Sequence, residues 1–185
     1  MQSASGYLEL FIGPMFSGKT SKLVELHKQY TFCNIPVLVI NHGLDQRYQE
    51  NESPQMSTHD LQRIDCCMLE LASDALWRPD YTAAAVVLIN EGQFFTDLYS
   101  TVVMMLHDGK RVYVAGLDGD FQRQKFGQVL DLVPMCDKVT KLVSLCSLCR
   151  NGAEAIFSKR LNTDLAQTVI GSADMYAPVC RACYK

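Results

Sequence analysis

A glycine-containing segment near the beginning of the chain constrains the fold more than any other part of the sequence. Residues 13–20 follow the pattern G-x-x-x-x-G-K-T, which forms the phosphate-binding loop of many nucleotide-binding proteins. An apolar run at residues 7–12 precedes the segment, and residues 19–32 have the spacing of an amphipathic helix. A segment of this pattern that binds phosphate lies between a strand and a helix. A glycine-rich turn that contained a lysine by chance would not need these two flanking elements.

The residue types in this loop each have a chemical role. Gly13 and Gly18 let backbone N–H groups turn toward phosphate oxygens, and the N-terminus of the following helix adds a partial positive charge. Lys19 is expected to contact the β- and γ-phosphates, and the hydroxyl of Thr20 is expected to ligate Mg²⁺. The sequence therefore predicts a site for ATP and Mg²⁺.

Length and charge narrow the class of protein. The 185 residues fit one main domain with at most a small appendage. The formal net charge of -3 lacks the basic excess that is typical of nucleic-acid-binding proteins, so we expect no nucleic acid as a partner. No apolar run is long enough to span a membrane, and residues 1–6 do not begin a signal peptide. These features predict a cytoplasmic protein without a membrane partner, with the nucleus as the alternative location.

Apolar runs alternate with helical patterns along the first 140 residues. Buried strands are expected at residues 35–40, 85–91 and 111–116, and a helix at residues 94–107. This alternation predicts an α/β fold with a mostly parallel sheet and helices on both faces. Ligands of such sheets bind beyond the carboxyl ends of the strands, so the segments that follow the strands are expected to converge there.

The intervening segments give weaker patterns. The polar composition of residues 41–63 predicts a loop, and residues 66–69 are expected to form a short strand. Asp74 is expected to cap a short helix that ends before Pro79. The last apolar run spans residues 139–145.

The pair Asn90 and Glu91 follows a predicted buried strand. Many phosphate-binding-loop proteins place an acidic residue at such a strand end to hold Mg²⁺, whereas this chain has Asn90. Glu91 is the adjacent carboxylate and is the candidate base for accepting a hydroxyl proton during phosphoryl transfer. The alternative role is a surface glutamate that begins a turn with Gly92.

Four of the eight cysteines form two C-x-x-C pairs separated by residues 150–179. Two such pairs have the spacing of a Cys₄ zinc site, which is closed and therefore structural; the alternative is a redox-active dithiol. The predicted zinc ligands are Cys146, Cys149, Cys180 and Cys183. The other cysteines follow no ligand spacing and are expected to be reduced thiols in apolar surroundings, at Cys33, Cys66, Cys67 and Cys136.

Several aromatic residues lie at the ends or edges of predicted elements. Their rings could stack on a planar base, although core packing is the simpler role for any single one. Phe121 and Phe126 are the more informative pair because they lie in a polar segment that directly follows a strand. The whole group comprises Phe94, Phe95, Phe121, Phe126 and Tyr176.

Taken together, these motifs resemble those of the type II thymidine kinases, the cellular and poxvirus-like class. The resemblance extends from about Leu8 to Tyr184. It includes the phosphate-binding loop, the two cysteine pairs and the segments at residues 45–48, 58–60, 91–95, 115–119, 121–123, 126–127, 159–161, 169–171, 173–174 and 176.

The resemblance implies a RecA-like, phosphate-binding-loop α/β domain at residues 1–140. It also implies a small zinc-binding domain at residues 141–185, which carries a lasso loop over the substrate. The implied reaction transfers the γ-phosphate of ATP to the 5′-hydroxyl of thymidine, giving thymidine monophosphate, with Glu91 as the catalytic base. Structural Zn²⁺, catalytic Mg²⁺, feedback inhibition by dTTP and a homotetramer are further family traits.

The resemblance also implies the residues that bind each substrate. ATP and its phosphates are expected to contact Gly13, Pro14, Met15, Phe16, Ser17, Gly18, Lys19, Thr20, Asp45, Arg47, Asn90 and Gln93. Thymidine is expected to contact Met15, Phe94, Leu117, Phe121, Phe126, Ser158, Gln167, Thr168, Val169, Ile170, Gly171 and Tyr176.

This chain departs from the family pattern at two places. The family usually has Asp at the position of Asn90, and apolar or acidic residues are common where this chain has Gln167 and Thr168. Two other functions stay open at this point. One is an ATP-driven nucleic-acid-binding protein with a zinc ribbon, and the other is an inactive relative that binds nucleotide without turnover.

Overall fold

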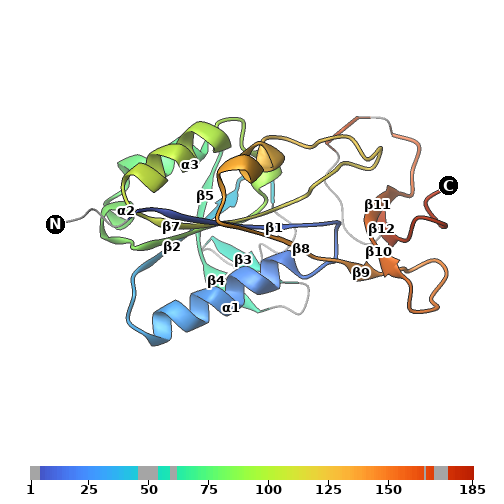
Figure 1. Ribbon diagram of the computed structural model, residues 1–185, viewed down its shortest axis with the longest axis horizontal. Helices are drawn as coiled ribbons and strands as arrows, with labels where there is room; N and C mark the ends of the chain where they lie inside the picture. The colour runs from blue at the N-terminus through green and yellow to red at the C-terminus, as the bar shows by residue number, and fades with distance from the viewer. Residues whose placement is uncertain (1–4, 46–53, 59–61, 165, 169–174) are drawn as a thin grey trace.

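The computed structural model describes residues 5–45, 54–58, 62–164, 166–168 and 175–185. At its centre, a six-stranded sheet has the order β5-β2-β6-β7-β1-β8, and every neighbouring pair is parallel (Figure 1). These strands are β1 (Tyr7–Ile12), β2 (Val37–His42), β5 (Cys67–Leu69), β6 (Val86–Ile89), β7 (Arg111–Gly116) and β8 (Lys138–Lys141). The predicted α/β fold with a parallel sheet is confirmed.

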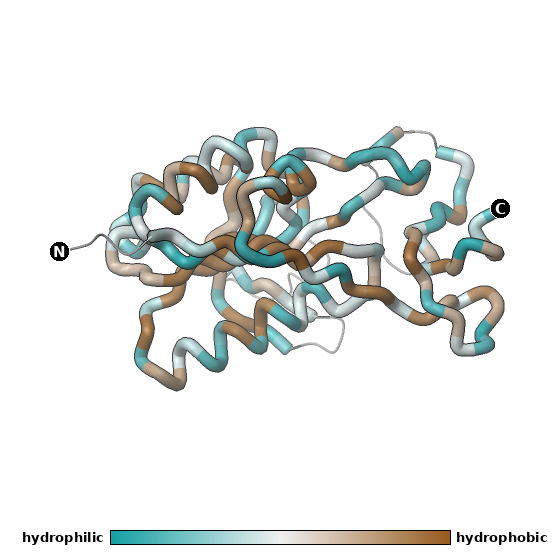
Figure 2. Tube along the Cα trace, in the orientation of Figure 1, coloured by the Kyte–Doolittle hydropathy of each residue, from teal (hydrophilic) through white to brown (hydrophobic). Residues whose placement is uncertain are grey.

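Helices cover both faces of the sheet, as the alternating pattern predicted. Helix α1 (Lys19–Phe32) lies on one face, and α2 (Pro79–Ala83) and α3 (Leu98–His107) lie on the other (Figure 1). Apolar side chains on each face form a separate core cluster, and all four residues of β6 are buried. Figure 2 shows the hydrophobic residues concentrated along the central strands. This double coverage explains why the strands are continuous apolar runs.

The connections differ in detail from the predictions. Asp74 does not cap a helix, because it lies inside the 3-10 helix η1 (Ala72–Trp77). The carboxylate of Asp97 instead accepts hydrogen bonds from the backbone N–H groups of Ala72 and Ser73, at 2.9 Å each. Pro79 begins α2, where a missing N–H group is tolerated.

Two further predictions were wrong in extent. The helix expected from Phe94 begins at Leu98, because a short 3-10 helix, η2 (Gly92–Phe94), and an extended Phe95 come first. The predicted loop at residues 41–63 contains β3 (Gln55–Ser57), which pairs with β4 (Arg63–Asp65) in antiparallel fashion. The hairpin packs Met56 and Ile64 into the core on the α1 side, a tertiary contact that the polar composition did not reveal.

The C-terminal part lies beyond the carboxyl ends of the parallel strands, at the right in Figure 1. It contains two antiparallel pairs, β9 (Ser144–Leu145) with β10 (Glu154–Ala155) and β11 (Phe157–Arg160) with β12 (Tyr176–Val179). A small apolar cluster that includes Cys146, with Cys180 and Cys183 packed against it, holds the pairs together. The domain boundary between residues 140 and 141 stays a prediction.

The remaining element, η3 (Val129–Met135), packs against the same face of the sheet as α3. Among the described residues, no helix is both long enough and apolar enough to cross a membrane.

Candidate active site

A pocket lies where the strand ends meet the C-terminal part, and most of the predicted site residues line it. From the predicted phosphate-binding set, residues 15–20, Asp45 and Gln93 contribute to the lining, and so does Glu91, the predicted catalytic base. From the predicted thymidine set, the lining residues are Met15, Phe94, Leu117, Phe121, Phe126, Ser158, Gln167, Thr168 and Tyr176. The segments that follow β1, β6 and β7 therefore converge as predicted.

Other predicted residues lie elsewhere. Gly13, Pro14 and Asn90 do not line this pocket. Arg47 and residues 169–171, which include Val169, Ile170 and Gly171, lie outside the described residues.

The phosphate-binding loop requires its glycines for two different reasons. Gly13 has φ 144°, and a Cβ atom there would lie 2.2 Å from the carbonyl oxygen of Leu142. Gly18 has open space around it but adopts the left-handed conformation, with φ 83°, directly before α1. The buried ammonium of Lys19 donates a hydrogen bond to the carbonyl of Pro14 at 2.6 Å. The lysine is thus held inside the curve of the loop, where phosphate oxygens are expected.

A chain of side-chain amides connects the loop to two strand ends. The Thr20 hydroxyl donates to Oδ1 of Asn90 at 3.3 Å, and Nδ2 of Asn90 donates to Oδ1 of Asn41 at 3.0 Å. Nδ2 of Asn41 in turn donates to Asp45 at 3.0 Å. The strand register explains the contact, because β2 and β6 pair Ile40 with Ile89 and each asparagine follows its strand residue. Sequence reasoning missed Asn41, although it ends an apolar run as Asn90 does.

Glu91 occupies an unusual backbone position at the end of β6. Its φ of 52° and ψ of 40° are left-handed, a conformation that costs a residue with a side chain on the order of 1–3 kcal/mol and is common at functional sites. The amide of Gln93 donates to the Glu91 carboxylate, and Oε1 of Gln93 accepts from the backbone N–H of Leu117 at 2.9 Å. The buried Gln93 therefore orients Glu91 from the ends of two neighbouring strands.

The opposite wall of the pocket is aromatic. The rings of Phe94 and Phe126 meet edge to face, with centroids 5.6 Å apart, and Phe121 and Tyr176 line the same wall. The hydroxyl oxygen of Ser158, in β11, accepts a hydrogen bond from the N–H of Met15 at 2.9 Å. This bond joins the C-terminal part directly to the phosphate-binding loop.

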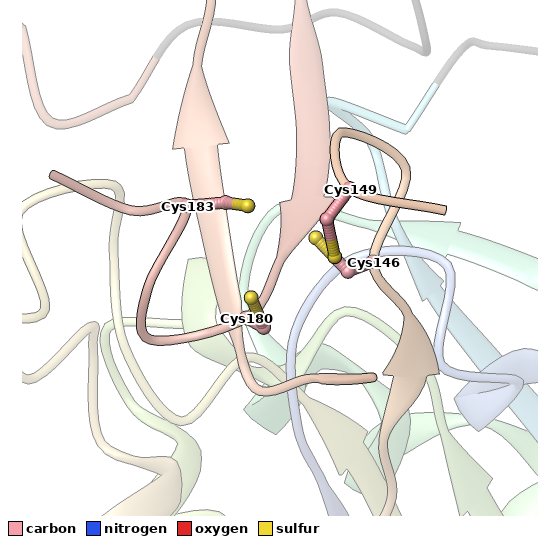
Figure 3. A group of neighbouring side chains, drawn as sticks. All are labelled: Cys146, Cys149, Cys180 and Cys183. Carbon is pink, nitrogen blue, oxygen red and sulfur yellow. The ribbon is translucent and has the colours of Figure 1, made fainter. Parts of the chain in front are cut away.

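The four paired cysteines gather at the end of the C-terminal part, with their sulfur atoms pointing toward one another (Figure 3). All four sulfur atoms lie within 4.8 Å of one another. A tetrahedral Cys₄ zinc site with Zn–S bonds of about 2.3 Å requires sulfur separations of roughly 3.8 Å, so the cluster is compatible with zinc. Hydrogen bonds from the backbone N–H groups of Cys149 and Cys180 lower the pKa of the Cys146 thiol to about 6, which favours its thiolate form. The side-chain hydrogen bond with Cys180 instead raises the pKa of the Cys183 thiol to about 12, so the case for a metal rests on the geometry of the four sulfur atoms.

The other four cysteines are free thiols, in agreement with the prediction that they are reduced. Burial raises the pKa of the Cys66 thiol to about 12 and also raises the pKa of Cys67. The prediction of apolar surroundings was wrong for Cys33, which is exposed at the C-terminal end of α1.

Comparison with known proteins assigns the family. A family model described as thymidine kinase matches residues 6–184. The chain belongs to the thymidine kinase family. Cytosolic thymidine kinases of Cricetulus griseus and Homo sapiens are each 40% identical over 183 residues, which is 97% of this chain and 73% of theirs. A thymidine kinase of Variola virus is 39% identical over 179 residues, covering 97% of both chains.

Family membership gives the pocket a chemical interpretation. A phosphate-binding loop and a carboxylate are parts that phosphoryl transfer to a hydroxyl group uses, and aromatic rings suit the face of a planar base. Sequence reasoning missed several residues of the site. Asn41 lies in the amide chain, and Arg160 of β11 binds Tyr176, although its position next to Lys159 gave no sign of burial. The lining residues that were not predicted are Ser21, Leu44, Ser57, Thr58, Gly119 and Asp120.

Proposed function

We propose that this protein is an ATP-dependent thymidine kinase that forms thymidine monophosphate. The observation that carries the proposal is the single pocket in which the phosphate-binding loop, Glu91 and the aromatic wall meet. Phosphoryl transfer depends on aligning the acceptor hydroxyl with the γ-phosphate and on neutralising the negative charge of the phosphates. Both require these groups to meet in one pocket. The family match over residues 6–184 supports thymidine as the acceptor.

The loop binds the phosphates of ATP. Its N–H groups, the N-terminus of α1 and Lys19 neutralise the negative charge that spreads over the γ-phosphoryl group. Thr20 and Asp45, which lie at the two ends of the amide chain, would hold Mg²⁺, and the ion supplies further charge neutralisation when it is bound. Hydroxyl and carboxylate oxygens are the ligands that this ion prefers.

Glu91 is the base in the proposed mechanism. Its carboxylate accepts the proton of the thymidine 5′-hydroxyl as the oxygen attacks the γ-phosphorus. Gln93 keeps the carboxylate aimed into the pocket through the bond described above. The proton thus moves to a group that the protein has already oriented.

The aromatic wall and the C-terminal part bind the nucleoside. Rings of Phe94, Phe121, Phe126 and Tyr176 offer apolar faces to the base and exclude water that would hydrolyse ATP. The stretch between the two cysteine pairs is the proposed lasso over the base. The backbone of residues 167–171, of which 169–171 lie outside the described residues, would bind the edge of the thymine. We assign the four clustered cysteines to one structural zinc ion that fixes the base of this lasso.

Three further properties belong to the proposal. They are feedback inhibition by dTTP, assembly into a homotetramer and a cytoplasmic location. Their support is the resemblance of the motifs to the type II class, together with the cytosolic class of two of the similar thymidine kinases.

The test is phosphorylation of radiolabelled thymidine by the purified protein with ATP and Mg²⁺, compared with uridine and with single-stranded DNA. We expect thymidine monophosphate well above the uridine control. Tight dTTP binding without product would identify an inactive relative and direct attention to Asn90. ATP hydrolysis that rises only when DNA is added would replace the proposal with a nucleic-acid-dependent ATPase.

A further inference from the structure

We infer that Arg160 is a positioning residue that fixes the nucleoside side of the pocket. It does so by holding together Phe121, Tyr176 and the backbone carbonyls of Asp164, Ala166 and Gln167. The inference rests on the proposed function for the identity of the ligand. Arg160 itself does not line the pocket, so it acts through residues that do.

Arg160 is buried, with 7% of its surface exposed, although it ends a strand near the C-terminus. Its Nε and Nη2 atoms donate to the hydroxyl oxygen of Tyr176, at 3.1 and 2.6 Å. Because β11 and β12 pair Arg160 with Tyr176, the two side chains belong to directly opposite positions of one hairpin. The tyrosine ring is therefore held from its polar end while its face contributes to the pocket wall.

The remaining donors of the guanidinium bind backbone carbonyls of the segment that follows β11. Nη1 donates to the carbonyls of Asp164, at 2.9 Å, and Ala166, and Nη2 donates to the carbonyl of Gln167 at 3.1 Å. These residues have no regular secondary structure to pair their carbonyls. One side chain thus supplies the hydrogen bonds that a helix or sheet would otherwise supply.

The same guanidinium lies over an aromatic ring. Its central carbon is 3.8 Å from the centroid of the Phe121 ring, which is within the range of a cation–π contact. Phe121 comes from the segment after β7, which is far in sequence from β11. Arg160 therefore joins two segments of the aromatic wall that are far apart in the sequence.

Gln167 adds a second connection between the segment after β11 and the segment that carries Phe121. Its amide donates to Oδ2 of the buried Asp120 at 2.7 Å, while Oδ1 of Asp120 accepts from the N–H groups of Gln122 and Gln124. The chain at Gln167 is consequently held at its carbonyl by Arg160 and at its side chain by the segment that carries Phe121. This contact gives a physical role to a glutamine that departs from the family pattern.

A lysine at position 160 could not make the same set of contacts. The planar guanidinium offers five N–H donors in fixed directions and stacks on a ring, whereas an ammonium group has three donors around one atom. Arg160→Lys should therefore retain the charge but lose part of the carbonyl contacts, and Arg160→Met should lose all of the hydrogen bonds while keeping an apolar stem.

The experiment compares Arg160→Met and Arg160→Lys with wild type in steady-state kinetics and in hydrogen–deuterium exchange of a peptide covering residues 161–168. The control is Arg78→Met, which removes an exposed arginine that pairs with Asp80 far from the pocket. Loss of several hydrogen bonds worth about 1 kcal/mol each predicts a thymidine KM at least tenfold higher for Arg160→Met. Arg160→Lys should show an intermediate rise of about threefold.

The kinetic and exchange measurements together decide whether Arg160 holds the nucleoside side of the pocket. We expect the KM for ATP to change less than twofold, and the 161–168 peptide to exchange faster in the order wild type, Arg160→Lys, Arg160→Met. Equal changes in both KM values, unchanged exchange, or global unfolding of both variants would overturn the inference. Absence of thymidine phosphorylation in wild type would refute the proposed function alone, because the exchange readout still decides whether Arg160 holds this segment.

Discussion

The two sides of the pocket are built by different means. On the phosphate side, parallel strands place the loop, Asn90 and Glu91 at one edge, and glycines permit the close backbone approach. On the nucleoside side, irregular chain is held by side-chain hydrogen bonds, ring contacts and a cysteine cluster. The first side depends on backbone register, and the second depends on a few individual side chains.

This difference has a functional consequence. A site whose residues are positioned by the register of paired strands holds reacting groups rigidly, and this rigidity suits charge neutralisation and proton transfer. A site that is held by individual side-chain contacts can lose one contact while the protein keeps its fold. Substitutions there should therefore alter the affinity for thymidine alone. We therefore expect substitutions on the phosphate side to change kcat and substitutions on the nucleoside side to change the KM for thymidine.

The largest expected effect is that of Glu91→Gln. The amide cannot accept the hydroxyl proton, so kcat should fall by about 10²–10⁴-fold while the affinity for thymidine changes little. Kinetics and equilibrium binding of labelled thymidine measure the two properties separately. Glu25→Gln is the matched control because Glu25 forms an exposed ion pair with Lys22 on α1. Near-normal turnover of Glu91→Gln would remove Glu91 from the mechanism.

The second effect tests whether the cysteine cluster supports the nucleoside side. Cys183→Ser should reduce bound zinc, lower Tm and raise the thymidine KM by about tenfold, because the loss of one ligand opens a closed structural site. Metal analysis, thermal melting and kinetics give three readouts. Cys33→Ser serves as the control, since Cys33 is exposed and lies outside the cluster. Loss of zinc with an unchanged thymidine KM would show that the cluster does not organise the pocket.

The contrast between the two sides also explains what could be predicted from the sequence. The phosphate-binding loop, β1 and α1 follow from local patterns, and both termini of α1 agree with the prediction. Convergence of the strand-end residues follows from the topology of parallel sheets. The cysteine cluster follows from spacing.

Other features depend on contacts between distant residues and leave no local pattern. Arg160 lies in a short strand beside Lys159, whose ammonium binds the carbonyls of Cys183 and Lys185, yet only Arg160 is buried. Strand alternation assigns them to opposite faces but does not say which face is inside. The side chain of Asp97, which binds the start of η1, is a similar case.

The third effect concerns the amide chain on the phosphate side. Asn90→Asp removes the donor that Nδ2 supplies to Asn41, and a reoriented Asn41 amide would no longer donate to Asp45. Since Asn90 is buried, we expect a loss of about 1–3 kcal/mol in the free energy of unfolding and a kcat several-fold below wild type. Denaturant unfolding and kinetics provide the measurements. The control is Asn34→Asp, at an exposed turn. If Asn90→Asp had higher turnover and unchanged stability, the role proposed for the chain of side-chain amides would be contradicted.

The smallest expected effect is that of Tyr184→Phe, which isolates one contact between the cysteine cluster and the aromatic wall. The Tyr184 hydroxyl, one residue after Cys183, donates to the carbonyl of Phe121 at 2.6 Å. Removal of a bond worth about 1 kcal/mol should raise the thymidine KM by roughly fivefold, with zinc content and the KM for ATP unchanged. Tyr99→Phe, at an exposed position on α3, controls for loss of a hydroxyl. A change in kcat without a change in the thymidine KM would show that the C-terminal part acts on the phosphate side, and the division between the two sides would then fail.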